Sequence, residues 1–344
     1  MIWLTYRQFR AQAITALAVL GVAVVYLIVT GLSMHHTYAV DLAACAPQHN
    51  CDNVLEEFRG TYDRLYTLMQ YLMLIAPGLI GIFWGAPLIG RELETGTHQL
   101  AWSQTVTRTR WLAAKLAGVG GASIAAAALL GYLLAWWSGP LDQIAGNRFG
   151  AATFVTHDIV PIGYAAFSFA LGATLGLVLR RTLAAMAVTI AVFIGIQILM
   201  PAVVRPHLIS PTTATFPVDQ ATAAHVWGFY EENGGVYLGG LPVPPAAWVL
   251  STSPMEDSAG RVVPLSAHLS CFHSQVSAAS ATGDSGPDIE QLAGCLAQYD
   301  LHEDVTYQPV SHYWALQRFE TGIFVALAAA LSGFCFWRIR RRQS

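Results

Sequence analysis

The sequence predicts an all-α polytopic membrane protein with six transmembrane helices, both termini cytoplasmic, and a loop-rich extracellular insertion between the fifth and sixth spans. Two observations predict this fold class. Of the 344 residues, 54% are hydrophobic and only 11% are charged, whereas soluble domains carry about 25% charged residues. The charges are also clustered, which leaves long windows almost free of them. We therefore expect a multi-pass protein of the plasma membrane.

Six windows are long and apolar enough to cross the membrane, since about 20 residues span about 30 Å of hydrocarbon. They are Ala13–Ser33, Leu68–Ile89, Leu116–Trp137, Ile159–Leu179, Leu183–Val203 and Phe319–Trp337. The first window could alternatively be the apolar part of a signal peptide. Its length exceeds the usual 7–15 residues and no A-x-A cleavage site closely follows it, so we count it as a span.

The charges between the windows orient the bundle. One set of loops contains twelve of the eighteen Lys and Arg residues and only two carboxylates, those of Glu92 and Glu94. The other set, which includes the long insertion, contains six arginines and nineteen carboxylates. Because basic loops stay in the cytoplasm, this pattern independently predicts six crossings with both termini inside.

The topology divides the chain into four regions. These are an amphipathic interfacial helix (1–12), the first five spans with an internal loop at 90–115 (13–203), an extracellular domain (204–317), and the sixth span with a basic tail (318–344). In the first region Ile2, Tyr6 and Phe9 recur at helical spacing while Arg7 and Arg10 lie off that stripe, which favours a helix in the inner interface. The alternative is a frayed basic terminus.

The insertion is rich in Pro, Gly, Ser and Thr and contains no apolar run long enough to cross a membrane. We expect a small domain with its own modest core. The candidate core residues are Trp227, Tyr230, Tyr237, Trp248, Val249, Leu250 and Phe272.

Four of the five cysteines fall in the predicted extracellular segments. An even number of cysteines in loop-rich extracellular sequence indicates disulfides. The simplest pairing joins Cys45 to Cys51 and Cys271 to Cys295, although four cysteines allow three connectivities. Cys335 lies alone in the sixth span.

The sequence lacks the motifs of several classes of site. Lys115 is the chain's single lysine and Leu116 follows it, so no P-loop of the form G-x-x-x-x-G-K-[ST] exists. No G-x-S-x-G nucleophile motif occurs either. His268, Cys271 and His273 stand close together but lack the second ligand pair of a structural zinc site. We therefore expect no metal, no cofactor and no ATP hydrolysis on this chain, and no nucleic-acid binding.

The internal loop at 90–115, GRELETGTHQLAWSQTVTRTRWLAAK, is the segment most informative about function. It holds both inner-face carboxylates, and Gly96 permits a tight bend after them. His98–Trp102 is long enough for about one helical turn, and Thr107 suits the N-cap of the helix entering the third span. A short helix with Leu100 and Trp102 on one side favours docking on a soluble partner. The alternative is a plain turn between two spans.

The runs R-E-L-E-T-G-T, Q-L-A-W-S-Q and V-T-R-T-R-W-L-x-x-K in this loop resemble the inner loop of type-2 ATP-binding-cassette exporter permeases, particularly actinobacterial ones. The similarity covers the architecture of residues 1–205 and 318–344 but is specific in sequence only over Gly90–Lys115. It implies that the loop docks on an ABC ATP-binding subunit, which carries the ATP and Mg²⁺, and that two permease subunits pack together as a homo- or heterodimer in lipid. It also implies that Glu92 and Glu94 lie at that contact. The full set of residues that we predict to take part in docking is Glu92, Glu94, Gly96, Leu100, Trp102 and Arg108. The large insertion departs from compact members and leaves the substrate class open.

A path for an apolar or amphipathic substrate would be lined by aromatic, methionine and a few polar side chains. Such residues share one face of the second span and one face of the fifth, the two spans that border the central path in the family resembled. They are Tyr66, Gln70, Met73, Phe193, Gln197 and Met200. The alternative is ordinary helix packing. The span interiors otherwise offer few polar groups, so we expect no proton-coupled carrier.

Two further functions stay open. The chain could be a non-transporting sensor or scaffold whose extracellular domain binds a ligand, or a membrane-anchored extracellular enzyme. Co-purification with an ATPase would argue against the enzyme, and ATP turnover that depends on substrate would separate an exporter from a sensor.

Overall fold

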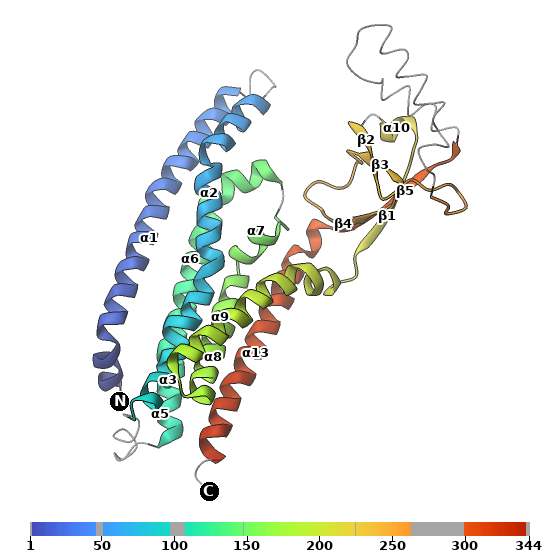
Figure 1. The fold of residues 1–344 in the computed structure, drawn as a ribbon. Helices are drawn as coiled ribbons and strands as arrows, with labels where there is room; N and C mark the ends of the chain where they lie inside the picture. Colours follow the sequence, from blue (N-terminus) through green and yellow to red (C-terminus); the bar gives the residue numbers. More distant parts are fainter. Residues whose placement is uncertain are drawn as a thin grey trace. The chain divides into compact units, whose positions relative to one another are not determined.

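The computed structural model describes residues 2–45, 51–96, 107–146, 148–223, 225–262 and 299–341. The chain forms two compact units. One comprises residues 1–208 and 313–344, and the other is the inserted unit Ile209–His312. The first unit is a helical bundle in which the start of the first helix and the end of the last helix lie at the same end (Figure 1). We call this the terminal end and the opposite one the far end.

In the described part of the chain six helices are long and apolar enough to cross a membrane, which confirms the predicted number of spans. They cover Ile14–Cys45, Asn53–Glu94, Arg108–Ile144, Val160–Leu179, Thr182–His207 and Val310–Arg341. Most of them extend past the predicted windows. The protein is thus a multi-pass membrane protein whose bundle is mostly helical.

The first two helices form a long hairpin. Helix α1 (Ile2–Cys45) has 44 residues, or about 66 Å at 1.5 Å per residue, so it exceeds the ~30 Å of hydrocarbon. Residues 2–12 belong to this continuous helix, and their placement in the membrane interface stays a prediction. Much of the segment predicted to be extracellular after the first span, Met34–Thr67, is helix, in α1 and in α2 (Asp52–Ile80).

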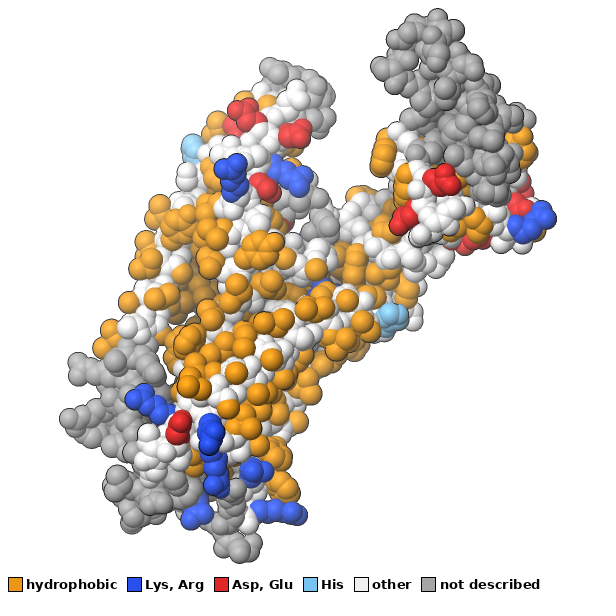
Figure 2. All heavy atoms as spheres, in the orientation of Figure 1, with side chains coloured by type: hydrophobic (Ala, Val, Ile, Leu, Met, Phe, Trp, Pro, Cys, Tyr) orange, Lys and Arg blue, Asp and Glu red, His pale blue; other side chains and the backbone are white. Residues whose placement is uncertain are grey.

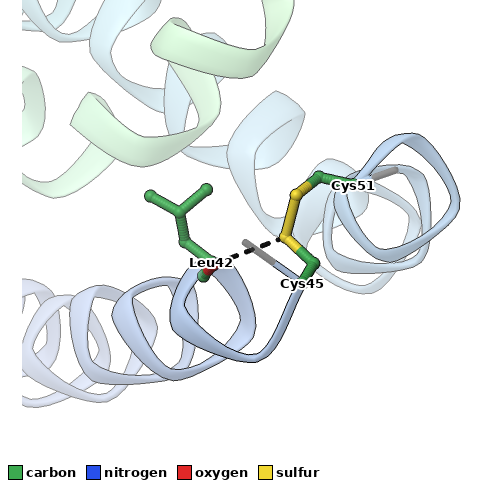
Figure 3. The surroundings of a disulfide bond; sticks show 3 residues. All are labelled: Leu42, Cys45 and Cys51. Carbon is green, nitrogen blue, oxygen red and sulfur yellow. Dashed lines mark hydrogen bonds between the residues drawn. A yellow bond between two sulfur atoms is a disulfide. The ribbon is translucent and has the colours of Figure 1, made fainter. Parts of the chain in front are cut away.

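A disulfide between Cys45 and Cys51 closes this hairpin and confirms the first predicted pairing (Figure 3). Cys45 Sγ lies 3.4 Å from the carbonyl oxygen of Leu42. This is a contact and not a hydrogen bond, since an oxidised sulfur carries no hydrogen. The predicted pair Cys271–Cys295 lies outside the described residues, whereas Cys335 is a buried free thiol.

Three spans contain a π-helical turn. In the second span η2 (Gly81–Gly85) joins α2 to α3 (Ala86–Glu94). In the third, η3 (Leu116–Gly120) joins α5 (Arg108–Lys115) to α6 (Gly121–Ala145). In the fifth, η4 (Met200–Val204) follows α9 (Thr182–Leu199) and precedes the short 3₁₀ segment η5 (Arg205–His207).

Helix α8 (Val160–Leu179) is the centre of the bundle, and most of its residues are buried. It packs on α13 (Tyr313–Arg341), α3, α9, α6 and η2. Its backbone meets the second span directly. A Cβ on Gly172 would lie 2.2 Å from the carbonyl oxygen of Gly81, and one on Gly176 would lie 2.5 Å from that of Ala86. Small residues at helix crossings allow such close approach in membranes.

A short helix, α7 (Ala151–Thr156), lies between α6 and α8. It is not a span, because it has only six residues. Phe154, Thr156 and His157 are nevertheless almost completely buried. The chain then turns through Asp158, which has a φ of 57°, and enters α8.

The described residues of the inserted unit form two small antiparallel sheets, which the expectation of a loop-rich insertion did not include. One has the strand order β1-β5-β4 and the other pairs β2 with β3. The strands are Thr212–Pro217 (β1), Gly228–Glu232 (β2), Gly235–Gly239 (β3), Trp248–Thr252 (β4) and His302–Gln308 (β5). A short helix α10 (Gln220–Ala223) follows β1, and η8 (Val310–His312) follows β5.

The β2–β3 hairpin turns through Asn233 and Gly234, which both have positive φ (51° and 81°). This is the Asn-Gly pattern of a type I′ turn, whose twist matches that of the strands.

The core of the inserted unit differs in part from the predicted one. Among the described residues of this unit, the buried hydrophobic ones are Val218, Val226, Val236, Leu238, Met255, Leu301, Val305 and Tyr307. Phe272 lies outside the described residues. Trp227, Tyr230 and Val249 are exposed instead, so their assignment to the core was wrong. One side of the Trp227 indole ring lies against the backbone of Gly239 and Gly240. Most of the ring is exposed to solvent.

Glu303 lies within this unit with a fully buried side chain. Its Oε2 accepts a hydrogen bond of 2.8 Å from the amide of Leu238, which ties the β2–β3 hairpin to β5. Burial raises the pKa of this carboxyl to about 7, and the Leu238 hydrogen bond opposes that shift. The carboxyl is thus held in an environment that disfavours its charge.

Figure 2 shows the surface that follows from these patterns. Hydrophobic side chains cover the visible face of the long helices, as expected of surface that meets lipid. Basic side chains gather at the terminal end, where Arg91, Arg110, Arg180, Arg181, Arg340 and Arg341 are exposed.

Candidate functional site

The internal loop has its stems in α3 and α5. Glu92 of α3 and Lys115 of α5 form an ion pair in which the lysine side chain is 2% exposed and the glutamate 14%. Lys115 Nζ also donates a hydrogen bond of 3.3 Å to the carbonyl oxygen of Leu88 and lies 4.7 Å from the centre of the Trp111 ring. The two stems are therefore joined at their base by a largely buried charge pair.

Glu94 connects the same loop to the fifth span. Its Oε2 accepts hydrogen bonds from the backbone nitrogen of Thr182 (3.0 Å) and from the hydroxyl of that residue (2.8 Å). Thr182 is the first residue of α9, where a carboxylate satisfies free N–H groups and complements the helix dipole. The second, third and fifth spans thus meet at the stems of the loop.

The other residues predicted for docking are placed in part. Helix α3 ends at Glu94, and Gly96 has a φ of +74°. Thr107 accepts a hydrogen bond of 3.4 Å from the amide of Arg110, which confirms it as the N-cap of α5, and Arg108 is the first residue of that helix. Leu100 and Trp102 lie outside the described residues. The docking role of the whole set stays a prediction.

The six residues predicted for the substrate path do not share one site. Tyr66 and Gln70 point into a polar cluster at the far end. The Tyr66 hydroxyl donates to Asp142 Oδ1 (2.7 Å), and Gln70 Nε2 donates to Thr153 Oγ1 (2.9 Å). Met73 packs instead among buried apolar residues of α1, α2 and α6.

Of the three residues on the fifth span, Phe193 contacts α2 and α8 and Gln197 contacts α2. The Phe193 ring lies 6.3 Å from that of Tyr164 and against Gly78. Gln197 Nε2 donates to the carbonyl oxygen of Leu74 (3.1 Å), while its Oε1 is buried and has no hydrogen-bond partner among the described residues. Met200 is buried in η4.

An apolar groove of about 430 Å³ lies between α1, α2 and α6. Of the six predicted path residues, Met73 alone lines it. The lining residues are Val19, Val22, Ala23, Tyr26, Leu27, Met69, Leu72, Met73, Ala76, Leu130 and Leu134. The groove can hold hydrocarbon but offers almost no polar group.

The fifth and sixth spans share a buried ion pair that the sequence analysis missed. Arg205 Nε donates to Glu320 Oε2 at 2.8 Å and its Nη2 to Oε1 at 3.1 Å, with both side chains fully buried. The Tyr164 hydroxyl donates to the same carboxylate at 2.9 Å. The guanidinium also lies 4.1 Å from the centre of the Phe154 ring, a favourable cation–π arrangement.

A second buried polar cluster lies at the far end of the bundle. His157 Nε2 lies 2.7 Å from Ser138 Oγ and 3.4 Å from Asp142 Oδ2. Ser138 Oγ also lies 2.7 Å from Asp142 Oδ2. The expectation of spans nearly free of ionisable groups was therefore wrong. The helices extend past the predicted windows, so charges assigned to their ends lie inside the bundle.

One comparison with known proteins identifies the family. The model of a family described as "ABC-2 membrane transporter related" matches residues 17–205, more than half of the chain. The chain belongs to this family. Neither the search of curated proteins nor the search of solved structures found a match.

The match places the loop and its stems within an ABC-2 permease. It covers the first five spans, the loop at 90–115 and the Arg205 end of the fifth span, but neither the inserted unit nor α13. ABC-2 permeases are in general non-enzymatic membrane subunits that work with an ABC ATP-binding subunit. Among the residues that the structure describes, no group of three or more His, Cys, Asp and Glu could hold a metal ion, and His268, Cys271 and His273 lie outside them.

The polar clusters of this ABC-2 permease were missed for an identifiable reason. Arg205 and Glu320 are 115 positions apart, and each stands near the end of an apolar window, where a charge is ordinary. The sequence held little signal for Glu320, because it is the second residue of the predicted window Phe319–Trp337. The helix itself begins seven residues before Glu320, at Tyr313, and a charge that far inside a span indicates a buried partner.

Proposed function

We propose that this ABC-2 permease is the transmembrane subunit of an actinobacterial-like exporter. It moves an apolar or amphipathic substrate out of the cell with energy from ATP hydrolysed by a separate ABC subunit. Three findings support this function: the family match, a sequence with no P-loop lysine, and the way in which the loop is braced. The contacts of Glu92 and Glu94 at the stems of the loop are the main support for the proposal, since they give a displacement of the loop a route into the spans.

The force would enter at the loop. In this proposal Leu100, Trp102 and Arg108 face the ATPase, Gly96 provides the bend, and Glu92 and Glu94 hold the stems. The ion pair of Glu92 with Lys115 transmits a displacement to the third span, and the hydrogen bonds of Glu94 to Thr182 transmit it to the fifth. ATP and Mg²⁺ would be bound by the partner alone.

The substrate class rests on two features. The groove between α1, α2 and α6 is apolar, which suits a hydrocarbon portion. Gln197 Oε1, buried without a partner in the part of the chain that the structure describes, suits a single polar group. Outward transport and a second permease subunit, identical or different, follow from the resemblance of the loop to exporter permeases.

The test uses the full chain co-expressed with an ABC ATPase and reconstituted in lipid vesicles. Trp102→Ala and Leu100→Ala should lower ATPase co-purification or uncouple ATP turnover from transport, since loss of an anchor side chain at an interface commonly costs ~2 kcal/mol. Glu57→Ala, at an exposed carboxylate of the α1–α2 hairpin, is the matched control. ATP turnover by the permease freed of every other protein, or normal assembly and transport in both loop variants, would contradict the proposal.

A sensor or scaffold is the second candidate. The observation that favours it is the inserted unit, which has two sheets and its own buried residues and so offers a ligand-binding body separate from the bundle. A ligand that binds this unit and never changes ATP turnover or transport would favour the sensor. Turnover that rises with a transported compound favours the exporter.

A further inference from the structure

Helix α7 is held inside the far end of the bundle by α2 and α13. Gln70 of α2 donates to Thr153 Oγ1 at 2.9 Å. Gln317 Nε2 of α13 donates to the carbonyl oxygen of Phe154 at 3.1 Å. Gln317 Oε1 accepts a hydrogen bond of 3.2 Å from the backbone nitrogen of Val160, at the start of α8, which orients the Gln317 side chain. A six-residue helix cannot be stable alone, so these contacts decide where α7 lies.

A further attachment is a three-residue latch formed by Ser138 and Asp142 of α6 with His157, the residue that follows α7. His157 Nδ1 lies 2.7 Å from the carbonyl oxygen of Thr153, which only accepts, so Nδ1 carries a hydrogen. Its Nε2 lies 2.7 Å from Ser138 Oγ, and that hydroxyl lies 2.7 Å from Asp142 Oδ2. Tyr66 donates to the other carboxylate oxygen.

Counting hydrogens shows what the latch requires. Ser138 has one hydrogen for two neighbours that can both accept it. Both short contacts are satisfied only if one further proton is present. If His157 Nε2 carries it, Nε2 donates to Ser138 Oγ and the Ser138 hydroxyl donates to Asp142 Oδ2. If Asp142 carries it, the carboxyl donates to Ser138 Oγ and the hydroxyl donates to His157 Nε2. Without that proton, two acceptors would face one another in a buried site, which is unfavourable because a buried polar group is then left without a hydrogen bond.

We propose that α7 is a movable closure of the substrate path, held shut by the proton shared among Ser138, Asp142 and His157. This inference rests on the proposed transport function. It places Tyr66 and Gln70 where the path meets the closure, since both contact this cluster. When the path opens at this end, Gln70 separates from Thr153, and Phe154, Val155 and Thr156 leave the bundle.

The first arm of the test measures accessibility and needs no transport. Val155→Cys places a thiol at a residue that is 4% exposed, and its labelling by a membrane-impermeant thiol reagent reports opening, with the parent chain as the blank. His157→Gln and Asp142→Asn should each raise the labelling rate about tenfold or more, since 1.4 kcal/mol corresponds to a factor of ten. His36→Gln, at an exposed histidine of α1, should leave the rate unchanged.

The second arm immobilises α7. Cysteines in place of Gln70 and Thr153, joined by a short reversible bifunctional thiol reagent, should stop transport in vesicles, and reductant should restore it. The parent treated in the same way controls for reduction of Cys45–Cys51. Ser138→Ala serves if the charge variants do not fold, and it should also raise the labelling rate.

The two arms distinguish the possible failures. Unchanged labelling in the latch variants, or full transport with α7 tethered, overturns the closure and leaves α7 as fixed packing. Failure of the parent to transport any compound counts against the proposed function, while the labelling result still decides whether α7 opens.

Discussion

Glu320 and Arg205 neutralise each other at a position from which water is excluded. Both side chains are fully buried, and the carboxylate accepts three hydrogen bonds, two from Arg205 and one from Tyr164. Glu320→Gln would leave the guanidinium charged and unpaired, so we expect the free energy of unfolding to fall by ~3–5 kcal/mol. The shift of the thermal midpoint of the purified protein in detergent measures this effect.

A double replacement separates the charge from the packing. Arg205→Met with Glu320→Leu should recover much of the loss, because buried ion pairs replaced by apolar residues of similar size are often near neutral. Glu57→Gln at an exposed carboxylate should change stability by less than ~1 kcal/mol. A single variant at Glu320 no worse than this control would show that the pair is solvated.

The carboxyl of Glu303 gives the inserted unit a pH dependence. Burial raises its folded-state pKa from the ordinary value of 4.5 to about 7. As pH rises through this interval the unfolded chain loses the proton first, so stability is complete below about 4.5 and is lost as pH passes 7. The loss is of the order of 3 kcal/mol, at about 1.4 kcal/mol per pKa unit.

Hydrogen exchange of the Leu238 amide, which donates to Glu303, measures that loss in the full chain. After correction for intrinsic exchange rates, protection should be lower at pH 8 than at pH 5. Glu303→Gln should remove the difference, and Glu231→Gln, at an exposed carboxylate, should keep it. Equal protection at both pH values in the parent would mean that Glu303 is not desolvated.

Sequence reasoning was least successful for individual buried residues. It identified Cys45, Cys51 and Thr107 because a disulfide or an N-cap depends on residues close in the chain. It missed Arg205 with Glu320, and Asp142 with His157, because their charges are compensated by residues from other helices. It misplaced Trp227, whose size suggested a core residue, because two adjacent glycines let the indole lie flat on the backbone.

At the scale of the elements, the crossing of α8 with the second span depends on glycine. A methyl group on Gly172 would lie 2.2 Å from the carbonyl oxygen of Gly81, an atom that cannot move without shifting η2. We expect Gly172→Ala to destabilise the bundle by ~1–3 kcal/mol, the usual cost of overpacking. The thermal midpoint in detergent is the measurement.

Gly121→Ala is the matched control in a helix. No atom outside its own helix turn lies within 4 Å of its added Cβ, so the better helix propensity of alanine should leave stability unchanged or raise it by up to ~1 kcal/mol. If both variants behave alike, the close approach of the two backbones is not needed for stability.

The six spans were predictable because hydrocarbon forces each to be a long apolar window. This requirement for a long apolar window does not apply to elements outside the membrane. The α1–α2 hairpin was expected to be extracellular loop, although only Gly60 interrupts the helical sequence between Met34 and Cys45 and between Asp52 and Thr67. The strands of the inserted unit are short, and their partner β5 follows long after β1 in the chain, so no local pattern reveals the pairing.

At the scale of the whole molecule, charge and span number predict one orientation in the membrane. A membrane-impermeant thiol reagent should label Glu57→Cys, near the closed end of the α1–α2 hairpin, on intact cells. It should reach Arg110→Cys, at the terminal end, only after permeabilisation. Both residues are exposed in the bundle, so burial does not confound the result. The reverse labelling pattern would contradict the orientation derived from the basic loops.

The π-helical turn at Gly81–Gly85 also sets the angular phase of the helix beyond it. A residue added to or removed from a helix rotates everything downstream by about 100° about the axis, since one turn takes 3.6 residues. Removing one residue from this turn would produce an unbroken α-helix, yet Glu92 would no longer point at Lys115, nor Glu94 at Thr182. The direction in which the loop leaves the membrane thus depends on the length of a single turn in the last third of the span Asn53–Glu94.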